Sequence, residues 1–220
     1  MSPANPIVEA VLAAADPPPG AVVADLACGA GRCALSLAQR RPDVRVIGVD
    51  RDPAAIEQAR AAAVANTEFA VMALEDLTIA TASVDVVVSV FGLFFVGDPQ
   101  RSVAEATRIL RPGGTISVAT YDDLGAHSLW AAVAPVLDRQ APPRRDLLPG
   151  LTATELAFAL PLPSFAAVWG LISHPDMFGE VDPAFEPAVR AAVDPYADPG
   201  GEGYTFPVSC TLISGALRVS

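Results

Sequence analysis

Short apolar runs alternate along the first half of this chain with segments in which apolar residues recur at helical spacing. The runs are rich in Val and carry few charges, which is typical of strands covered on both faces. They predict strands at residues 21–26, 44–49, 68–72, 83–90 and 115–121. The segments between them predict helices at residues 32–40, 53 to about 66 and 99 to about 110. This alternation is typical of a parallel sheet flanked by helices.

The two ends of the chain are less regular. Residues 5–15 indicate a short helix, and the proline-rich residues 17–20 form a stiff connector into the first strand. Beyond residue 121 the pattern predicts further helices and strands. The helices are expected at about 128–138, 165–172 and 183–193, and the strands at about 155–160 and 204–217. With 220 residues, of which 52% are hydrophobic, the chain is expected to form one well-packed domain.

A tight turn with two glycines follows the first strand. Gly29 and Gly31 lack Cβ atoms, so the backbone can turn sharply and a ligand can lie against the peptide planes. The next helix points its free N–H groups and the positive end of its dipole at such a ligand. Asp50 ends the second strand, where a carboxylate can accept hydrogen bonds from both hydroxyls of a ribose. The stretch therefore predicts a site for a ribose-bearing cofactor.

Two classes of cofactor are compatible with this turn. The spacing Gly29-x-Gly31-x-x-Ala34 satisfies the dinucleotide fingerprint in its Gly/Ala form, which favours an NAD(P)-binding oxidoreductase. Asp25, near the end of the first strand, favours a different ligand. A pyrophosphate would repel this carboxylate, whereas the ammonium and sulfonium groups of S-adenosylmethionine would attract it.

The residues from Asp25 to Gly31, DLACGAG, match the motif D-x-x-C-G-x-G of the class I S-adenosylmethionine-dependent methyltransferases. The chain resembles this family from residue 22 to residue 121, although the family more often has glycine at the position of Ala27. The segment 91–96 and the RPGG turn at 111–114 resemble the small-molecule branch that includes the ubiquinone/menaquinone C-methyltransferase-like proteins. The resemblance implies an α/β fold: a Rossmann-like doubly wound sheet of about seven strands, mostly parallel, with an antiparallel last strand beside the sixth.

The resemblance also implies a set of cofactor-binding residues at the carboxyl ends of the strands. These residues are Asp25, Ala27, Cys28, Gly29, Gly31, Asp50, Arg51, Leu74, Glu75, Val90 and Phe91. The turn after the third strand brackets the adenine in this family. Ala73 stands where the family often has Asp, which leaves the main chain of Leu74 and the side chain of Glu75 or Asp76 for recognition.

No residue stands out as a general base. Tyr121 and His127 follow the fifth strand at the expected catalytic edge and are the candidates. Asp122 and Asp123 are more simply explained as turn and helix-cap residues. The aromatic residues in the segment 91–95 fit the core and the wall of an acceptor pocket equally well.

Charge narrows the range of partners. The formal net charge is −11, and every one of the 14 cationic residues is Arg. Binding to nucleic acid or to an anionic membrane needs clustered positive charge, so neither is expected, and covalent chemistry on Lys is excluded. A small-molecule acceptor is the expectation that remains.

Cysteine and histidine are scarce. The three cysteines, Cys28, Cys33 and Cys210, have no CxxC spacing, and only His127 and His174 could complete a metal site. We therefore expect no disulfide, no bound metal and a reducing cytoplasm. The N-terminus has no basic region before an apolar run, so we expect no signal peptide.

Residues 156–173 are uncharged, but Pro161 and Pro163 interrupt them, so a continuous membrane-spanning helix is not expected. A strand, a turn and a helix fit better, buried inside the domain or at a subunit contact.

We expect a single methyltransferase domain over residues 1–220. Residues 1–20 would form an N-terminal helix and linker, 21–121 the cofactor-binding core, and 122–220 cap elements on the acceptor side with the last two strands. A homodimer, in which a twofold partner covers the acceptor mouth, is compatible with the brief N-terminal arm.

Three functions follow from these observations. The first is methyl transfer from S-adenosylmethionine to a small, apolar metabolite, with O, N or C as the accepting atom, by in-line displacement. The second is an NAD(P)-binding oxidoreductase, although the missing Lys removes its commonest catalytic arrangement. The third is a methyltransferase-like binding module that does not transfer methyl groups.

Overall fold

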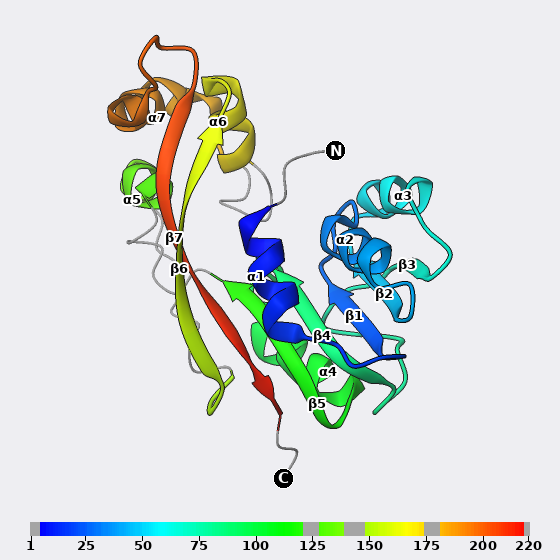
Figure 1. The fold of residues 1–220 in the computed structure, drawn as a ribbon. Helices are drawn as coiled ribbons and strands as arrows, with labels where there is room; N and C mark the ends of the chain where they lie inside the picture. The colour runs from blue at the N-terminus through cyan, green and yellow to red at the C-terminus, as the bar shows by residue number, and fades with distance from the viewer. Residues whose placement is uncertain (1–4, 121–127, 139–147, 174–180, 218–220) are drawn as a thin grey trace. The chain divides into compact units, whose positions relative to one another are not determined.

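The computed structural model of the chain describes residues 5–120, 128–138, 148–173 and 181–217. Its strands form a seven-stranded sheet in the order β3-β2-β1-β4-β5-β7-β6 (Figure 1). The strands are β1 (Val22–Leu26), β2 (Arg45–Asp50), β3 (Thr67–Val71), β4 (Val84–Val90), β5 (Leu110–Thr120), β6 (Thr152–Leu162) and β7 (Tyr204–Ala216). The helices are α1 (Pro6–Ala15), α2 (Arg32–Arg40), α3 (Pro53–Ala61), α4 (Pro99–Ile109), α5 (Ser128–Val133), α6 (Phe165–Ile172) and α7 (Glu186–Val193), with short 3₁₀ turns η2 (Pro183–Phe185) and η3 (Asp194–Tyr196).

Strand β1 lies at the centre of the parallel part of the sheet. It pairs in parallel with β2, where Asp25 lies beside Gly48, and with β4, where Asp25 lies beside Val88. Strands β3 and β5 extend the parallel part on either side, so the carboxyl ends of β1 to β5 meet at one edge. Strand β7 runs antiparallel to β5, with Thr120 opposite Thr211, and lies next to β6. The predicted mostly parallel sheet with an antiparallel last strand is confirmed.

Several helices begin where the sequence supplies a cap. The side chain of Asn5 accepts a hydrogen bond of 2.9 Å from the N–H of Ile7 at the start of α1. Asp52 and Asp98 accept bonds of 2.8 and 2.9 Å in the same way at the starts of α3 and α4. A proline follows each cap in the first turn, where its missing N–H costs no hydrogen bond.

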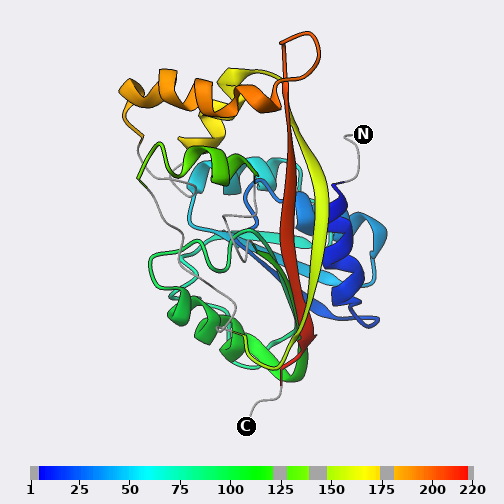
Figure 2. The same cartoon turned by 90° about the vertical axis from the view of Figure 1, so that its left-hand side faces the viewer.

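Helices cover both faces of the parallel strands. Figures 1 and 2 show α1 and α2 on one face and α4 on the other. Helix α1 packs on β4 and β5, where the buried Ser117 hydroxyl donates a bond of 2.9 Å to the carbonyl of Val11. A buried apolar cluster joins the sheet to α4 on the opposite face and includes Leu26, Val87 and Ile109. Packing on both faces explains why these strands are continuous apolar runs.

The chain divides into two compact units. The first contains residues 1–120, 145–154 and 211–220, and so contains the glycine turn and Asp50. The second contains residues 121–144 and 155–210. An aromatic cluster packs the second unit: the rings of Tyr196 and Phe206 lie 4.8 Å apart, and the Arg190 guanidinium lies 3.7 Å from the centre of the Phe165 ring.

Two helices end earlier than predicted. Helix α3 ends at Ala61, not near residue 66, because the side-chain amide of Asn66 donates to three carbonyls at the end of α2 and the start of β2, those of Ala38, Arg41 and Val44. Helix α5 ends at Val133, not near residue 138, because Pro135 lacks the N–H that a helix interior needs.

Two strands are longer than predicted. Strand β5 already begins at Leu110, and the RPGG segment forms an irregularity within it: the pairing shifts from Val84 with Leu110 to Val86 with Thr115. Strand β6 spans Thr152–Leu162 and leads into α6, as the strand, turn and helix prediction requires. Of the two expected surroundings of this segment, the interior of the domain is wrong for β6, because its residues are exposed or half-buried. A subunit contact stays a prediction. Across the described part of the chain, no helix is both long and apolar enough to cross a bilayer.

Candidate active site at the carboxyl ends of β1, β2 and β4

The glycine turn connects β1 to α2 as predicted. Gly29 has φ +53° and Gly31 has φ +82°, conformations that favour glycine. A Cβ on Gly31 would lie 3.1 Å from Ala59 and from the Phe69 ring, so this glycine serves close packing. A Cβ on Gly29 would meet nothing within 4 Å, so the backbone of Gly29 faces open space. Gly29 is therefore the point in this turn where a ligand can lie against the main chain.

Asp50 holds the turn in place. Its Oδ2 atom accepts a bond of 2.8 Å from the N–H of Gly29, and its Oδ1 atom accepts one of 3.0 Å from the N–H of Asp52. A carboxylate has about four acceptor positions, so each oxygen retains capacity for one more donor. The half-buried Asp50 therefore fits the predicted contact with two hydroxyls of a ribose.

Asp25 is buried beneath the turn, with only 1% of its surface exposed. Its Oδ2 atom accepts a bond of 2.9 Å from the N–H of Ala34 in the first turn of α2. Burial raises the pKa of Asp25 to about 7; the Ala34 hydrogen bond opposes this rise, and the nearby Asp50 charge adds to it. Asp25 therefore fastens the start of α2 to the end of β1, a role that its position in the sequence does not predict.

Ala27 and Phe91 both adopt left-handed backbone conformations, with φ of 59° and 58°. Ala27 lies just after β1, and Phe91 follows Val90 at the end of β4, so both flank the same edge of the sheet. Val90 and Phe91 are half-buried there, and the N–H of Phe91 donates a bond of 2.9 Å to the carbonyl of Ala119. Phe94 is 1% exposed and belongs to the core, which leaves Phe91 and Phe95 as accessible aromatic residues of this segment.

The proposed adenine-binding turn supports α4. Leu74 is 4% exposed and its side chain lies in the core cluster, so only its main chain is available to a ligand. The side chain of Glu75 accepts a bond of 3.3 Å from the N–H of Asp98, and its carbonyl accepts one of 3.0 Å from Arg101. Arg51 is exposed directly after Asp50.

The cysteines are structural. Cys28, Cys33 and Cys210 are all buried, and none of them forms a disulfide in the part of the chain that the structure describes. Burial, above all, raises the pKa of the Cys28 and Cys33 thiols well above the ordinary value, and the Asp25 charge adds to this. The part of the chain that the structure describes holds no group of three or more His, Cys, Asp or Glu residues that could bind a metal ion.

The two candidate bases cannot be placed. Tyr121 and His127 lie outside the residues that the structure describes, as do Asp122 and Asp123. Their roles stay predictions.

Ser89 is a site residue whose role sequence reasoning missed. This fully buried side chain donates a bond of 2.7 Å to the carbonyl of Leu26 and accepts one of 3.0 Å from the N–H of Leu93. It thereby ties the end of β1 to the turn after β4. The sequence did contain a signal for this role: Ser89 is a hydroxyl residue within the apolar run of β4. A buried hydroxyl needs a hydrogen-bond partner, which indicates a contact with a neighbouring element.

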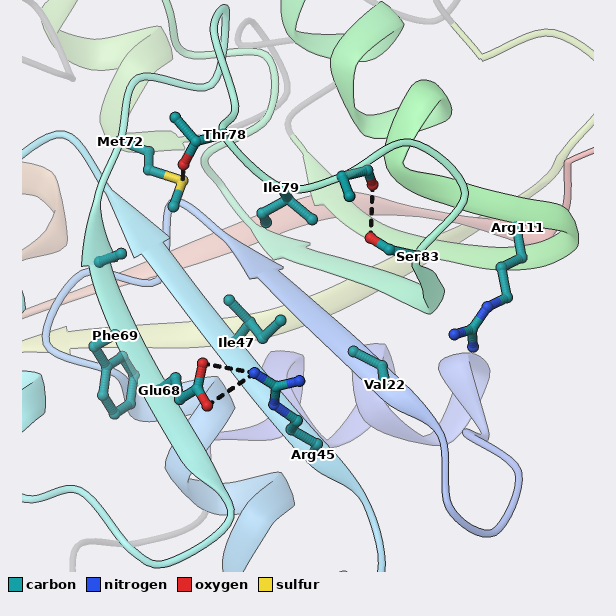
Figure 3. A pocket seen from close by; sticks show the side chains of 12 residues that line it. Val22, Arg45, Ile47, Glu68, Phe69, Met72, Thr78, Ile79, Ser83 and Arg111 are labelled. Carbon is teal, nitrogen blue, oxygen red and sulfur yellow. Dashed lines mark hydrogen bonds and ion pairs between the residues drawn. The ribbon is translucent and has the colours of Figure 1, made fainter.

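A groove of about 430 Å³ lies elsewhere on the first unit (Figure 3). Its lining extends from Val22 and Arg45, the first residues of β1 and β2, to Met72 after β3, and includes neither Gly29 nor Asp50. Arg45 forms an ion pair of 2.8 Å with Glu68, and Arg111 pairs with Asp85. Because the charges that line the groove are paired and the groove does not include the glycine turn, the candidate site is the carboxyl edge.

The carboxyl edge combines two features that suit the nucleoside part of a cofactor. Gly29 offers bare backbone, and Asp50 offers free acceptor capacity. Asp25 lies beneath this edge and caps the first turn of α2 through the N–H of Ala34. The residues present therefore fit the adenosine part of S-adenosylmethionine.

Comparison with known proteins agrees with this geometry. Residues 23–114 match a methyltransferase domain family. The chain is 37% identical over 106 residues to an arsenite methyltransferase of Halobacterium salinarum, with 46% of this chain and 27% of that protein covered. It is 34% identical over 118 residues to a trans-aconitate 2-methyltransferase of Deinococcus radiodurans, with 53% and 45% covered. The chain thus spans less than half the length of these curated relatives.

Solved structures share the fold over nearly the whole chain. The YcgJ protein of Bacillus subtilis has a TM-score of 0.73 at 17% identity, with 97% of this chain and 99% of that chain covered. Geranyl diphosphate methyltransferase, solved in complex with S-adenosylmethionine, has a TM-score of 0.58 at 19% identity, with 96% and 84% covered. Residues 23–114 of the chain thus match a methyltransferase domain family, and the chain shares its fold with these solved structures.

Proposed function

We propose that this protein transfers the methyl group of S-adenosylmethionine to a small-molecule acceptor. The observation that carries the proposal is the pairing of Gly29 with Asp50. A bare stretch of backbone faces open space at the start of a helix, and the carboxylate that holds it retains capacity for the hydroxyls of a ribose. The family match over residues 23–114 supports the same assignment.

Each residue at the edge has a role in this proposal. Asp50 binds the ribose hydroxyls, and Gly29 and Cys28 give the cofactor close access to the main chain. Asp25 orients α2, and the main chain of Leu74 with Glu75 flanks the adenine. Ala27, Val90 and Phe91 border the reacting end, with Gly31 shaping the turn and Arg51 at its rim.

S-adenosylmethionine, when bound, would supply a methyl group already activated on a sulfonium: an O, N or C atom of the acceptor would bond to the methyl carbon in line as the C–S bond breaks and S-adenosylhomocysteine leaves. The protein then has to align the acceptor and exclude water, which can account for several kcal/mol of barrier lowering. The half-buried Phe91 and Phe95 suit an apolar acceptor. A base such as His127 or Tyr121 is needed only for an acceptor that is poorly ionised at neutral pH.

The finer assignments are also proposals. The aromatic segment 91–95 and the RPGG turn support a place in the ubiquinone/menaquinone C-methyltransferase-like branch. We place the protein in the cytoplasm because its three cysteines have no disulfide spacing. We propose no nucleic-acid or membrane partner because of its net charge of −11. A homodimer and a single-domain organisation remain part of the proposal.

Transfer of a labelled methyl group tests this function. The purified protein is incubated with S-adenosylmethionine that carries a radioactive methyl group and with a panel of small quinones, phenols, amines and carboxylates. Label in any acceptor supports the proposal. Binding of S-adenosylhomocysteine without transfer to any acceptor favours the methyltransferase-like binding module, and binding of NADH in its place favours the oxidoreductase.

A further inference from the structure

Ala27 and Gly92 meet where the ends of β1 and β4 lie side by side. A Cβ atom on Gly92 would lie 2.1 Å from the Cβ of Ala27 and 3.2 Å from both the carbonyl of Leu26 and the hydroxyl of Ser89. Two carbon atoms in van der Waals contact need about 3.5–4.0 Å. The contact therefore has room for one methyl group, and Ala27 supplies it.

The methyl group belongs to the residue of the pair whose backbone conformation disfavours a side chain. Ala27 has φ +59°, in the left-handed region that favours glycine. Gly92 is not among the residues with positive φ, so alanine is excluded there by space alone. The opposite arrangement, with glycine at 27 and alanine at 92, would be conformationally easier. Such strain persists where the surrounding structure enforces it, and it clusters at functional sites.

Gly92 cannot withdraw from the contact. The Ser89 hydroxyl bonds both the carbonyl of Leu26 and the N–H of Leu93, at 2.7 and 3.0 Å. The hydroxyl of Ser102 in α4 donates a bond of 2.6 Å to the carbonyl of Leu93. The Phe91 N–H is bonded to β5. The segment 91–93 is therefore fixed by hydrogen bonds to β1, α4 and β5, so Gly92 cannot move away from the methyl group of Ala27.

We propose that Ala27 and Gly92 are positioning residues, which set the distance between the turn 27–31 and the segment 91–93. This inference rests on the proposed function, in which the turn holds the cofactor and the segment borders the reacting methyl. The Ala27 methyl acts as a spacer, and Gly92 is the surface on which it rests. Neither residue needs to react; each acts through the position of the turn.

The test exchanges the methyl group across the contact. The variants Gly92→Ala, Ala27→Gly and the double variant Ala27→Gly/Gly92→Ala are titrated with S-adenosylhomocysteine in a calorimeter, well below their unfolding temperatures. We expect Gly92→Ala to weaken binding about tenfold or more and Ala27→Gly about three- to tenfold, whereas the double variant regains affinity to within about threefold of the wild type. Restored affinity would show that one methyl at the contact is what the cofactor turn needs.

Gly114→Ala is the matched control. A Cβ on Gly114 would lie 2.9 Å from the carbonyls of Arg111 and Asp85, so this substitution also crowds the sheet, but at the opposite edge. It should lower the unfolding temperature and leave the affinity for S-adenosylhomocysteine unchanged.

A merely structural contact would give a different result. Ala27→Gly would then bind like the wild type, and the inference would be wrong. It would also be wrong if Gly92→Ala bound normally, or if the double variant stayed as weak as Gly92→Ala. If the wild type itself fails to bind S-adenosylhomocysteine, the proposed function falls and the inference falls with it, so the two failures are distinguishable.

Discussion

The carboxylate of Asp50, the last residue of β2, accepts a hydrogen bond of 2.8 Å from the backbone N–H of Gly29 in the turn after β1. One side chain thus fixes the loop against which a cofactor would lie and offers its remaining acceptor capacity to that cofactor. The binding edge is in this way prepared before any ligand arrives, which reduces the cost of ordering the loop on binding.

Replacing Asp50 should weaken cofactor binding strongly. Asp50→Ala removes the predicted bonds to the ribose and the bond to Gly29, so we expect a loss of about 1–3 kcal/mol, or about 5- to 150-fold in affinity. Calorimetric titration with S-adenosylhomocysteine measures it. Glu68→Gln is the control, because Glu68 forms an exposed ion pair with Arg45 near the other end of the strands. Unchanged affinity in Asp50→Ala would refute the site.

The two glycines of the turn should respond differently to alanine. Gly31→Ala meets Ala59 and Phe69 at 3.1 Å as well as an unfavourable φ, so it should lower the free energy of unfolding by about 2–4 kcal/mol. Gly29→Ala adds only backbone strain of about 1–2 kcal/mol, but its methyl group projects into the space proposed for the ligand.

Urea denaturation and ligand titration of both variants separate the two effects. Gly31→Ala should be the less stable variant and Gly29→Ala the one with the larger loss of affinity relative to its loss of stability. The reverse order would contradict the placement of the ligand at Gly29.

Asp25 should make stability depend on pH. Its pKa is raised from 3.8 to about 7 in the folded protein, so the folded state binds more protons than the unfolded state between these values. Stability from this group is therefore greatest at low pH and falls as pH rises from about 4 to about 7, by at most about 4 kcal/mol. Asp25→Asn keeps an acceptor for Ala34 without the charge, so it should be more stable than the wild type at pH 8 by about 1–3 kcal/mol.

Urea denaturation of the wild type and Asp25→Asn at pH 5 and pH 8 tests this prediction. The advantage of Asp25→Asn should be larger at pH 8 than at pH 5, because the wild-type stability begins to fall near pH 4 and the fall is complete only near pH 7. Equal stability of the two proteins at pH 8 would show that Asp25 is not desolvated in the way the structure describes.

Glu105 should contribute in the opposite direction. This buried residue of α4 accepts bonds of 2.8 Å from Arg108 and 2.9 Å from the N–H of Leu77. The Arg108 bond is the main cause that lowers the pKa of Glu105 from 4.5 to about 2, against the effect of burial. Its stabilisation is complete above about pH 5 and is lost as pH falls toward 2.

Glu105→Gln should therefore lower the free energy of unfolding at pH 7 by about 1–3 kcal/mol. The difference from the wild type should shrink as the pH falls below 4. Thermal unfolding of both proteins at pH 7 and pH 3 checks this, and a difference that stays constant with pH would exclude an ionised Glu105 as the cause.

Much of the fold and part of the candidate site could be predicted from local patterns in the sequence. The apolar runs, the Asp52 and Asp98 caps and the glycine turn depend on neighbours in sequence, and the structure confirms them. The end of α3 was mispredicted because Asn66 finds its partners in another element, at Ala38 and Val44.

The contact of Ala27 with Gly92 was beyond prediction for the same reason. The two residues are far apart in sequence, and only the pairing of β1 with β4 brings them together. The burial of Asp25 likewise depends on α2 folding back over β1, so a reading of the chain alone gave it a ligand role and missed its bond to Ala34.

The central claim, that the edge at Gly29 and Asp50 is built for a sulfonium nucleoside, is tested most directly by a pair of titrations. Calorimetry of the wild-type protein with S-adenosylhomocysteine should show saturable binding of one ligand per chain, and the same titration with NADH should show none. Binding of NADH, or no binding of S-adenosylhomocysteine at millimolar concentration, would contradict the claim.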